Sequence, residues 1–518
     1  MPLEEYVDLA LQVDKTVLLC CLGLATVFLL ALQVRKALIT RQKLKSIPTV
    51  GSSGIIGSWI DAFKFIFHAK DIIEEGQRMY GSVFKVPLLD RWTVVVTGAG
   101  KINDIRKSSL EELAHFADIP EDASAMRRAR IIGLMTTRLD PFHKEVVRGA
   151  LTRNIASCFA DVQDEIEAAF RDNIPMTEDW IEIPAYETIL RIVCRASNRM
   201  FVGLPLCRNP EYIKLNINYT IHIFAFGRII NVLPTVLKMI LSLIFTPRRQ
   251  ATAKTEKFLG DTIRERMHQQ DVYGKDWPGK PNDLVSWLLD ITYGDGKRRS
   301  VKDLCDRLLL LNTSAIHTTA MTFTTALYAL ATHPEYTEIL RDEVEAIINE
   351  EGYTKSAMGK MNKLDSFVKE SQRLYGNPSV FGMTRKTRKD FVFSDGTVVP
   401  AGVHIAVASL STHTDEVNYE DPLEFKPWRF SEKGTQEGKG IRQYYMATLS
   451  LDFVFFGNGR PACPGRFFAV NELKALMTYV LLNFDVKLDK FPTPVWLYEH
   501  QMPNPNSKVL FRKRVRTP

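Results

Sequence analysis

One cysteine stands in a loop whose residues tightly restrict the local backbone. Residues 455–468 read FFGNGRPACPGRFF, with Cys463 near the centre. Glycine lets a backbone approach a neighbouring group closely, and proline limits the conformations of a loop. The loop contains both types, namely Gly457, Gly459, Gly465, Pro461 and Pro464. Residues 466–483 then read as a helix whose positive N-terminal end lies near the thiol. Taken alone, such a cysteine is more often a buried structural residue than a ligand.

The other cysteines and the net charge exclude several classes of protein. The chain has seven cysteines, an odd number at wide spacings, and no CxxC pair. Neither a disulfide framework nor a structural zinc site is therefore expected, and a reducing compartment is indicated. The net charge of +7 is small for 518 residues and is spread along the chain. A nucleic-acid-binding protein is not indicated.

The N-terminal region carries the pattern of a membrane anchor. Residues 16–34 contain no charged side chain. This uncharged segment is long enough for a helix that spans a bilayer. Acidic residues dominate before this segment and basic residues follow it, so the body of the protein is expected in the cytosol. We predict a lumenal tip at 1–15, a transmembrane anchor at 16–34, a basic flank with a Pro/Gly hinge at 35–58, and one catalytic domain at 59–518.

The body is predicted to be α+β and predominantly helical. Residues 82–98 read as two paired strands with a turn at 89–91, and residues 391–409 return to strand and turn character. The run 301–332 lacks glycine and proline and predicts one long central helix. A second apolar stretch at 229–245 is interrupted by polar residues and proline, so it is either a core helix or a surface element that dips into a bilayer.

The pattern around Cys463 resembles the haem-binding loop of the cytochrome P-450 superfamily. The matching positions are Phe456, Gly459, Cys463 and Gly465, in the longer string FGNGRPACPGRFFA. The string is most similar to a fungal microsomal branch with ent-kaurene oxidase-like and steroid- or terpenoid-hydroxylating enzymes. This resemblance implies the P-450 fold, with a long central helix over a haem b whose iron Cys463 ligates axially. It also implies that Phe456, Gly459 and Gly465 contact the cofactor.

Two segments upstream resemble the structural motifs of the same family. KESQRL places Glu370 and Arg373 three residues apart on one helical face. FKPWRF supplies Arg429, so the resemblance implies a carboxylate held between two guanidinium groups, with a structural role. A second ExxR pattern, Glu338 and Arg341, is interpreted as a surface pair.

The central helix contains a stretch that is similar to the oxygen-binding segment of the family. In SAIHTTA, Ala315 takes a small position that keeps the helix close to the porphyrin. Thr318 takes the position of the threonine, whose hydroxyl can bond back to a carbonyl one turn earlier. His317 stands where the family usually has an acid. We therefore predict Thr318 and His317 as the catalytic residues for oxygen activation and proton delivery.

The carboxylates of a haem pair with cations. The resemblance indicates three arginines for this contact. Arg385 matches the family position before a strand that reaches a haem propionate, and Arg148 matches the arginine of an early helix. Lys144 replaces the tryptophan that is usual in that helix. Pro461 replaces the basic residue that is usual two positions before the cysteine, and Arg460 beside it is predicted to take over the contact.

The resemblance implies a monooxygenase that uses NADPH and O2. Electrons are expected from NADPH-cytochrome P-450 reductase, because the chain has no flavin or dinucleotide fingerprint. The endoplasmic reticulum membrane is the expected location. The substrate is expected to be lipophilic, a terpenoid or steroid of secondary metabolism, bound by residues 135–138, 310–318, 378–383 and 501–504. Two alternatives remain: a haem-thiolate isomerase or dehydratase that needs no external electrons, and an inactive membrane-anchored binding protein.

Overall fold

A computed structural model of the chain describes most of the residues. The described ranges are 38–115, 140–232, 247–293, 299–376, 378–436 and 440–515, with isolated positions between 20 and 35. The predicted tip, most of the predicted anchor at 16–34, and the predicted pocket stretch 135–138 lie outside these ranges. Among the described residues, none of the helices has both the length and the apolar character that crossing a bilayer requires.

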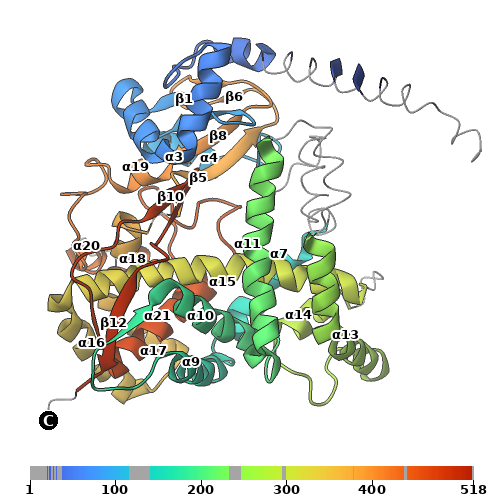
Figure 1. Ribbon diagram of the computed structural model, residues 1–518, viewed down its shortest axis with the longest axis vertical. Coiled ribbons are helices and arrows are strands. Elements are labelled where there is room, and N and C mark those ends of the chain that lie inside the picture. The colour runs from blue at the N-terminus through green and yellow to red at the C-terminus, as the bar shows by residue number, and fades with distance from the viewer. Residues whose placement is uncertain are drawn as a thin grey trace, which may run out of the picture.

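The long helix α15 (Val301–Thr332) runs through the middle of the molecule (Figure 1) and confirms the central helix predicted from the sequence. Its N-terminus is capped by Ser300, whose side chain accepts a hydrogen bond from the N–H of Asp303. The helices α10 (Ala185–Phe201), α11 (Pro210–Val232) and α13 (Pro247–Tyr273) pack against it. This packing places one face of α15 in the core and leaves another to line a site.

A mixed sheet lies beside the helices at the upper end of the view in Figure 1. Its strand order is β1 (Val83–Pro87), β2 (Trp92–Val96), β8 (His404–Ala408), β5 (Phe381–Thr387) and β3 (Leu113–His115). β1 and β2 pair antiparallel, β2 and β8 pair parallel, and the remaining pairs are antiparallel. The prediction of two paired strands at 82–98 is confirmed.

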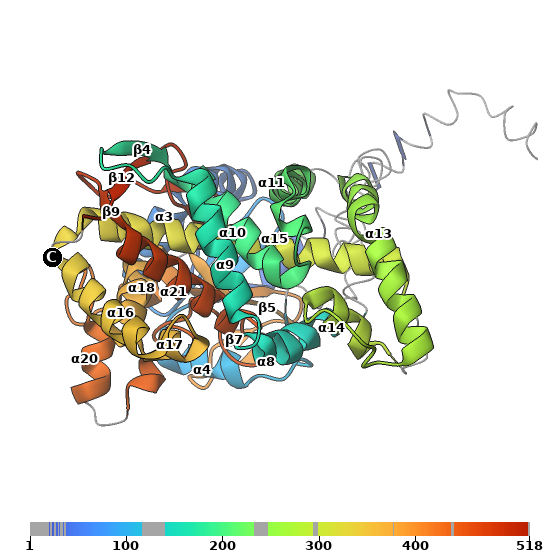
Figure 2. The ribbon, with the colours of Figure 1, turned by 90° about the horizontal axis from the view of Figure 1, so that it is seen from below.

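The other elements complete a body dominated by helices. Two of them, α9 (Phe159–Asn173) and α21 (Arg466–Asn483), pack against each other (Figure 2); α9 also packs on α10, and α21 packs on α15. The smaller sheets are β4 (Ile181–Pro184) with β12 (Lys508–Lys513) and β9 (Phe484–Lys487), β10 (Val495–Leu497) with β11 (His500–Met502), and β6 (Phe391–Val392) with β7 (Val398–Val399). The remaining helices are α3 (Ile55–Tyr80), α4 (Ala99–Lys107), α7 (Phe142–Val146), the π-helix η2 (Val147–Leu151), α8 (Thr152–Asn154), η3 (Leu206–Arg208), α14 (Leu284–Ile291), η4 (Pro334–Tyr336), α16 (Thr337–Glu351), α17 (Lys355–Lys360), α18 (Asn362–Leu374), α19 (Ser409–His413), α20 (Arg429–Gln436) and η5 (Ile441–Tyr444).

Part of the predicted flank and hinge at 35–58 packs against the body. Leu44, Ile47 and Val50 are buried, and the N–H of Val50 donates to the carbonyl of Lys85 at 3.1 Å. The buried ammonium of Lys85 donates to the carbonyls of Leu44, at 2.6 Å, and Ile47. α3 already begins at Ile55. The segment is therefore part of the fold rather than a free joint.

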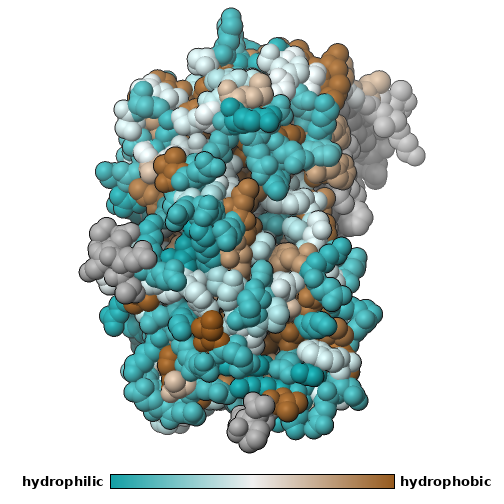
Figure 3. Space-filling model, turned by 90° about the vertical axis from the view of Figure 1, so that its left-hand side faces the viewer, coloured by the Kyte–Doolittle hydropathy of each residue, from teal (hydrophilic) through white to brown (hydrophobic). Residues whose placement is uncertain are grey.

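Most of the apolar side chains lie inside this body. The largest buried cluster joins residues of α10, α15, α18 and α21. Hydrophilic residues dominate the face drawn in Figure 3, where hydrophobic residues form separate patches. The second apolar stretch predicted at 229–245 lies outside the described residues beyond Val232, the last residue of α11.

Candidate functional site

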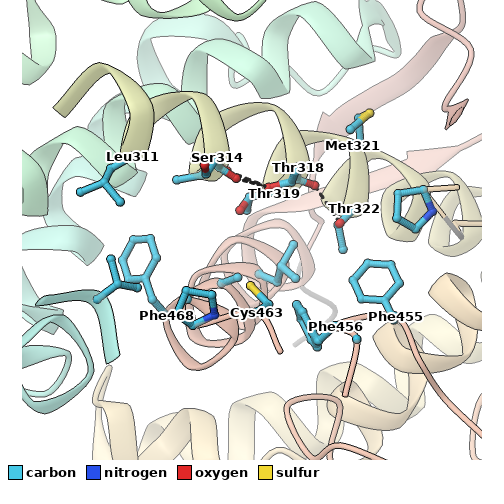
Figure 4. Close-up of a pocket in the computed structure, with 18 of the residues that line it drawn as sticks. Leu311, Ser314, Thr318, Thr319, Met321, Thr322, Phe455, Phe456, Cys463 and Phe468 are labelled. Atoms are coloured by element: carbon cyan, nitrogen blue, oxygen red, sulfur yellow. Dashed lines mark hydrogen bonds between the residues drawn. The ribbon is translucent and has the colours of Figure 1, made fainter. Parts of the chain in front are cut away.

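A cavity of about 710 Å³ separates α15 from the loop that carries Cys463. Figure 4 shows Thr318 and its neighbours on one side and Cys463 and Phe456 on the other. The lining is mostly apolar and includes Leu311 and Phe468. Such a cavity has the size and the character that a cofactor and a lipophilic ligand require.

The loop before α21 holds Cys463 through backbone contacts. The N–H of Cys463 donates to the carbonyl of Phe456 at 2.9 Å, which closes the loop on itself. Gly457 and Gly459 have φ angles of +69° and +73°, in the left-handed region that favours glycine. A Cβ atom on Gly459 would lie 2.7 Å from the carbonyl oxygen of Arg106 in α4. Only glycine fits there, so the sequence requirement at position 459 comes from contact with α4.

The sulfur of Cys463 faces the cavity (Figure 4). Burial raises the pKa of the Cys463 thiol, while the N–H groups of Gly465 and Arg466 and the Arg466 guanidinium oppose that rise. Hydrogen bonds of this kind stabilise a thiolate that is bound to a metal. The prediction that Arg466 begins a helix is confirmed by α21, whose N-terminal end lies at this sulfur.

On the opposite side of the cavity, α15 presents Ala315 and Thr318. The hydroxyl of Thr318 donates to the carbonyl of Ser314 at 2.6 Å (Figure 4), so the predicted bond to the preceding turn is present. The helix remains continuous through this point. The small side chain of Ala315 keeps the helix backbone close to the space above Cys463.

His317 does not line the cavity with Thr318. Its Nδ1 lies 3.3 Å from the hydroxyl of Tyr186 in α10, and its Nε2 lies 3.1 Å from the carbonyl oxygen of Ile217 in α11. Because a carbonyl can only accept, Nε2 carries the proton and Nδ1 accepts from Tyr186. Burial lowers the pKa of His317, and the Ile217 carbonyl opposes this. His317, the predicted proton donor, thus lies in the contact of α15 with α10 and α11. The next residue, Thr318, lines the cavity.

Arg385 is the predicted cation that the structure brings to the cavity. Its side chain is buried on β5 and donates to the carbonyl of Asn458 at 3.4 Å. A register shift in β5 between Gly382 and Arg385, with Met383 at a φ of +47°, re-aims the strand at this point. His115 of β3 pairs directly with Arg385 and also lines the cavity.

Arg148 and Arg460 contact each other outside the cavity lining. The guanidinium of Arg148, on the π-helix η2, donates to the backbone carbonyl of Arg460 at 2.9 Å, and both side chains are exposed. The structure therefore uses Arg148 to tie η2 to the cysteine loop. Lys144, at the position where the family motif has tryptophan, lines the cavity instead. Contact of either arginine with a cofactor stays a prediction.

Glu370, Arg373 and Arg429 come together in one buried cluster. The Arg373 guanidinium donates to both carboxylate oxygens of Glu370, at 2.7 and 2.8 Å, and Nε of Arg429 lies 3.1 Å from the same carboxylate. Arg373 also donates to the carbonyls of His413 and Pro422. These bonds join α18 to the segment that precedes the cysteine loop, as the sequence motifs predict.

The second ExxR pattern is more than a surface pair. Arg341 is buried and donates to the carbonyls of Leu481 and Phe484 and to the carboxylate of Asp485. Only Glu338 is exposed. The interpretation from sequence was wrong for Arg341, because spacing within one helix says nothing about the end of α21 that packs against it.

Comparison with known proteins identifies the family. The model of the family described as Cytochrome P-450 matches residues 56–511, nearly the whole described body. The chain belongs to the cytochrome P-450 family. Cytochrome P-450 monooxygenase 151 of Postia placenta is 41% identical over 91% of this chain and 94% of its own length. Ent-kaurene oxidase of Fusarium fujikuroi is 29% identical over 90% of this chain and 88% of its own length.

Solved structures show the same P-450 fold. The retinoic acid-bound cyanobacterial CYP120A1 superposes with a TM-score of 0.69 at 20% identity, covering 90% of this chain and 99% of the other. Together with the fungal relatives, the family assignment makes the protein a P-450 monooxygenase. The family implies a haem-thiolate cofactor, dioxygen, an organic substrate and a redox partner.

The residues around the P-450 cavity fit a haem-thiolate group. The backbone N–H groups of Gly465 and Arg466 oppose the rise that burial causes in the pKa of the Cys463 thiol, and Gly457 lines the cavity with it. Phe456 and Gly465 line the same wall as the sulfur. Arg385 is buried beside the loop, where a cofactor carboxylate could pair with it.

Sequence reasoning missed two polar residues of the lining. His115 and His143 line the cavity, although neither of them belongs to a motif match. His143 is buried, and burial together with the Arg307 and Lys144 charges lowers its pKa to about 3, so it is neutral at physiological pH. The strand pairing of His115 with Arg385 is a long-range contact, which no local pattern reveals.

The different placements of Thr318 and His317 predict different effects of substitution. Thr318→Ala removes the cavity hydroxyl and is expected to lower product formation by about 10²-fold, as loss of a positioned proton donor does. His317→Gln is expected to change it by less than about threefold, because an amide can replace one of the two contacts between helices. Product formed per NADPH oxidised measures both. An equal loss in His317→Gln would return His317 to proton delivery.

Proposed function

We propose that the protein is an NADPH- and O2-dependent monooxygenase that oxidises a lipophilic terpenoid or steroid in fungal secondary metabolism, with a haem b iron bound to Cys463. The observation that carries the proposal is a largely apolar cavity with a thiol on one wall and Thr318 on the other. When bound, a haem-thiolate group supplies the activation of dioxygen and its transfer to a C–H bond. Ent-kaurene oxidase, a relative at 29% identity, supports the terpenoid class.

The protein's own residues have distinct tasks in this proposal. The Cys463 sulfur would hold the metal, and the N–H groups of Gly465 and Arg466, which oppose the rise in its pKa, would favour the thiolate there. The Thr318 hydroxyl, which rests on the Ser314 carbonyl, is placed to pass a proton at its Oγ1 atom to a ligand in the cavity. Apolar side chains such as Leu311 and Phe468 exclude water and position the substrate. Thr318 at this wall favours oxygen activation over isomerisation without external electrons.

The redox partner in this proposal is NADPH-cytochrome P-450 reductase, and the location is the endoplasmic reticulum membrane with the catalytic domain in the cytosol. An exposed apolar row on α3 supports the membrane. Its members follow a helical period, namely Ile55, Ile56, Trp59, Ile60, Phe63 and Phe67. A row of this kind is suited to lie against a bilayer beside a single-pass anchor at 16–34. Recovery of the enzyme in the soluble fraction of expressing yeast would contradict the membrane location.

A product screen tests the proposed reaction. Yeast microsomes that contain the enzyme, with and without the reductase, receive matched panels of terpenes, sterols and small aromatics. Products heavier by one oxygen atom are expected from the terpene or sterol panel, only with NADPH and the reductase. Conversion without NADPH would favour the isomerase or dehydratase alternative. Conversion of small polar aromatics alone would contradict the substrate class.

A further inference from the structure

His143 presents a hydrogen-bond donor of fixed tautomer to the cavity. Its side chain is buried and lines the cavity. The Nδ1 atom lies 3.0 Å from Nη1 of Arg307 in α15. A guanidinium group can only donate, so Nδ1 accepts and Nε2 carries the proton of the ring. Nε2 has no hydrogen-bond partner among the described residues and is not fully enclosed by them, so its N–H group remains accessible.

The Arg307 guanidinium, which fixes this tautomer, is itself held in place on several sides. Its side chain is only 1% exposed. Nε donates to the carboxylate of Asp303 at 2.9 Å, and Nη1 also donates to the carbonyl of Asp140 at 2.8 Å. The Cζ atom lies 3.7 Å from the ring centre of Phe142. Turning the guanidinium away from His143 would break buried hydrogen bonds, which is unfavourable.

The His143 ring lies where the two walls of the cavity meet. Arg307 connects the ring to α15. One turn further along the chain, Val147 lies against the cysteine loop, because a Cβ on Gly465 would be 3.7 Å from its Cγ1 atom. A flat group held between α15 and Cys463 therefore has its edge, rather than its face, toward His143.

The charged side chains of the lining favour a negatively charged ligand. Lys144 and Arg385 bring positive charge to the cavity, and the described residues that line it include no aspartate or glutamate. Burial and the charges of Arg307 and Lys144 lower the pKa of His143 to about 3, so the ring stays a neutral donor. Hydrogen bonds to an ionised oxygen are stronger than those between neutral groups, so a carboxylate is the acceptor that suits this position best.

We propose that His143 binds a carboxylate in the cavity through its Nε2–H group. This carboxylate belongs to the haem or to the substrate, and the chemistry that His143 recognises is the same in both. The first source rests only on the haem-thiolate group that the family implies. The second source rests on the proposed function and narrows its substrate to a lipophilic acid.

Two substitutions of His143 separate the donor from the rest of the ring. His143→Asn puts an amide oxygen near the place of Nδ1, so it keeps the acceptor for Arg307 and lacks the distal donor. His143→Gln puts its NH2 group near the place of Nε2 and keeps that donor. A loss in the first variant that the second does not share therefore indicates the hydrogen bond, because a role in packing alone would impair both.

Release of haem from the purified holoenzymes tests the first source. Excess apomyoglobin takes up the haem as the enzyme releases it, and absorbance follows the transfer. If the haem supplies the carboxylate, His143→Asn is expected to release haem about tenfold faster than the wild type, the effect of one lost hydrogen bond. His143→Gln is expected to stay within about threefold of the wild type, since it retains a donor.

Equilibrium dialysis of the same holoenzymes tests the second source. The probes are two pairs of one skeleton each, dehydroabietane with dehydroabietic acid and cholane with cholanic acid. If the substrate supplies the carboxylate, the ratio of the hydrocarbon to the acid dissociation constant is expected to be about tenfold lower in His143→Asn than in the wild type for at least one pair. His143→Gln is expected to keep this ratio within about threefold. A ratio within one variant cancels a general loss of affinity.

His404→Asn is the matched control, because His404 on β8 is 7% exposed, close to the 6% of His143, and does not line the cavity. It is expected to leave both measurements within about twofold. His143→Leu replaces His143→Asn, with the same expectations, if the asparagine variant does not fold by circular dichroism. The proposal is overturned if loss of the donor changes neither measurement, or if His143→Gln is impaired as much as the donor-free variant in both. The carbon monoxide spectrum of the wild type reports the haem-thiolate centre separately, so a failure of the proposed function is distinguishable.

Discussion

Cys463→Ala is expected to abolish the red-shifted Soret band that a thiolate-ligated haem gives after reduction and exposure to carbon monoxide. Activity in the product screen should fall below detection with it. The physical reason is that no other sulfur among the described residues lines the cavity near the loop apart from Met321 and Met383, whose thioethers carry no negative charge. A charged sulfur donor is what gives the band its position.

Cys305→Ala serves as the control for this change. Cys305 is fully buried on α15, does not line the cavity, and has a thiol pKa that burial raises to about 12. Its loss should leave the band in place. Circular dichroism and haem content of Cys463→Ala separate loss of the ligand from loss of the fold. A red-shifted band in folded Cys463→Ala would contradict the assignment of the axial ligand.

Glu370→Ala is expected to destabilise the enzyme by about 3–5 kcal/mol, the usual effect of removing one partner of a buried ion pair. Both Glu370 and Arg373 are 0% exposed, so the variant would leave a guanidinium charge inside the protein. Arg429 would lose the same partner. The free energy of unfolding in guanidinium chloride and the haem content after purification measure the effect.

Glu338→Ala is the matched control, because it removes the acid from the same ExxR pattern at the surface. The Glu338 side chain is 70% exposed, and Arg341 keeps its bond to Asp485. The expected change is below about 1 kcal/mol, as for other exposed ion pairs. Similar losses in the two variants would mean that the Glu370 cluster has no special role in stability.

Local patterns predicted the elements whose cause is local. The absence of glycine and proline from 301–332 was enough to predict α15. The apolar runs on both sides of a short turn were enough to predict the pairing of β1 and β2. The Gly- and Pro-rich loop before α21 was likewise recognisable, since its glycines are required by φ angles and by contact with Arg106.

Contacts between distant segments were not predictable in the same way. The direction of His317 depends on Tyr186 and Ile217, which lie on α10 and α11. Lys85 determines that the segment around Ile47 packs on the body, although that segment has the composition of a hinge.

The buried Lys85 ammonium also fixes the segment 44–50 on β1. One ammonium holds the carbonyls of Leu44 and Ile47, and Val50 pairs with the same strand. Residues 44–50 are therefore held against the body by these hydrogen bonds. Extra residues within 44–50 would therefore disturb the packing of this segment on β1.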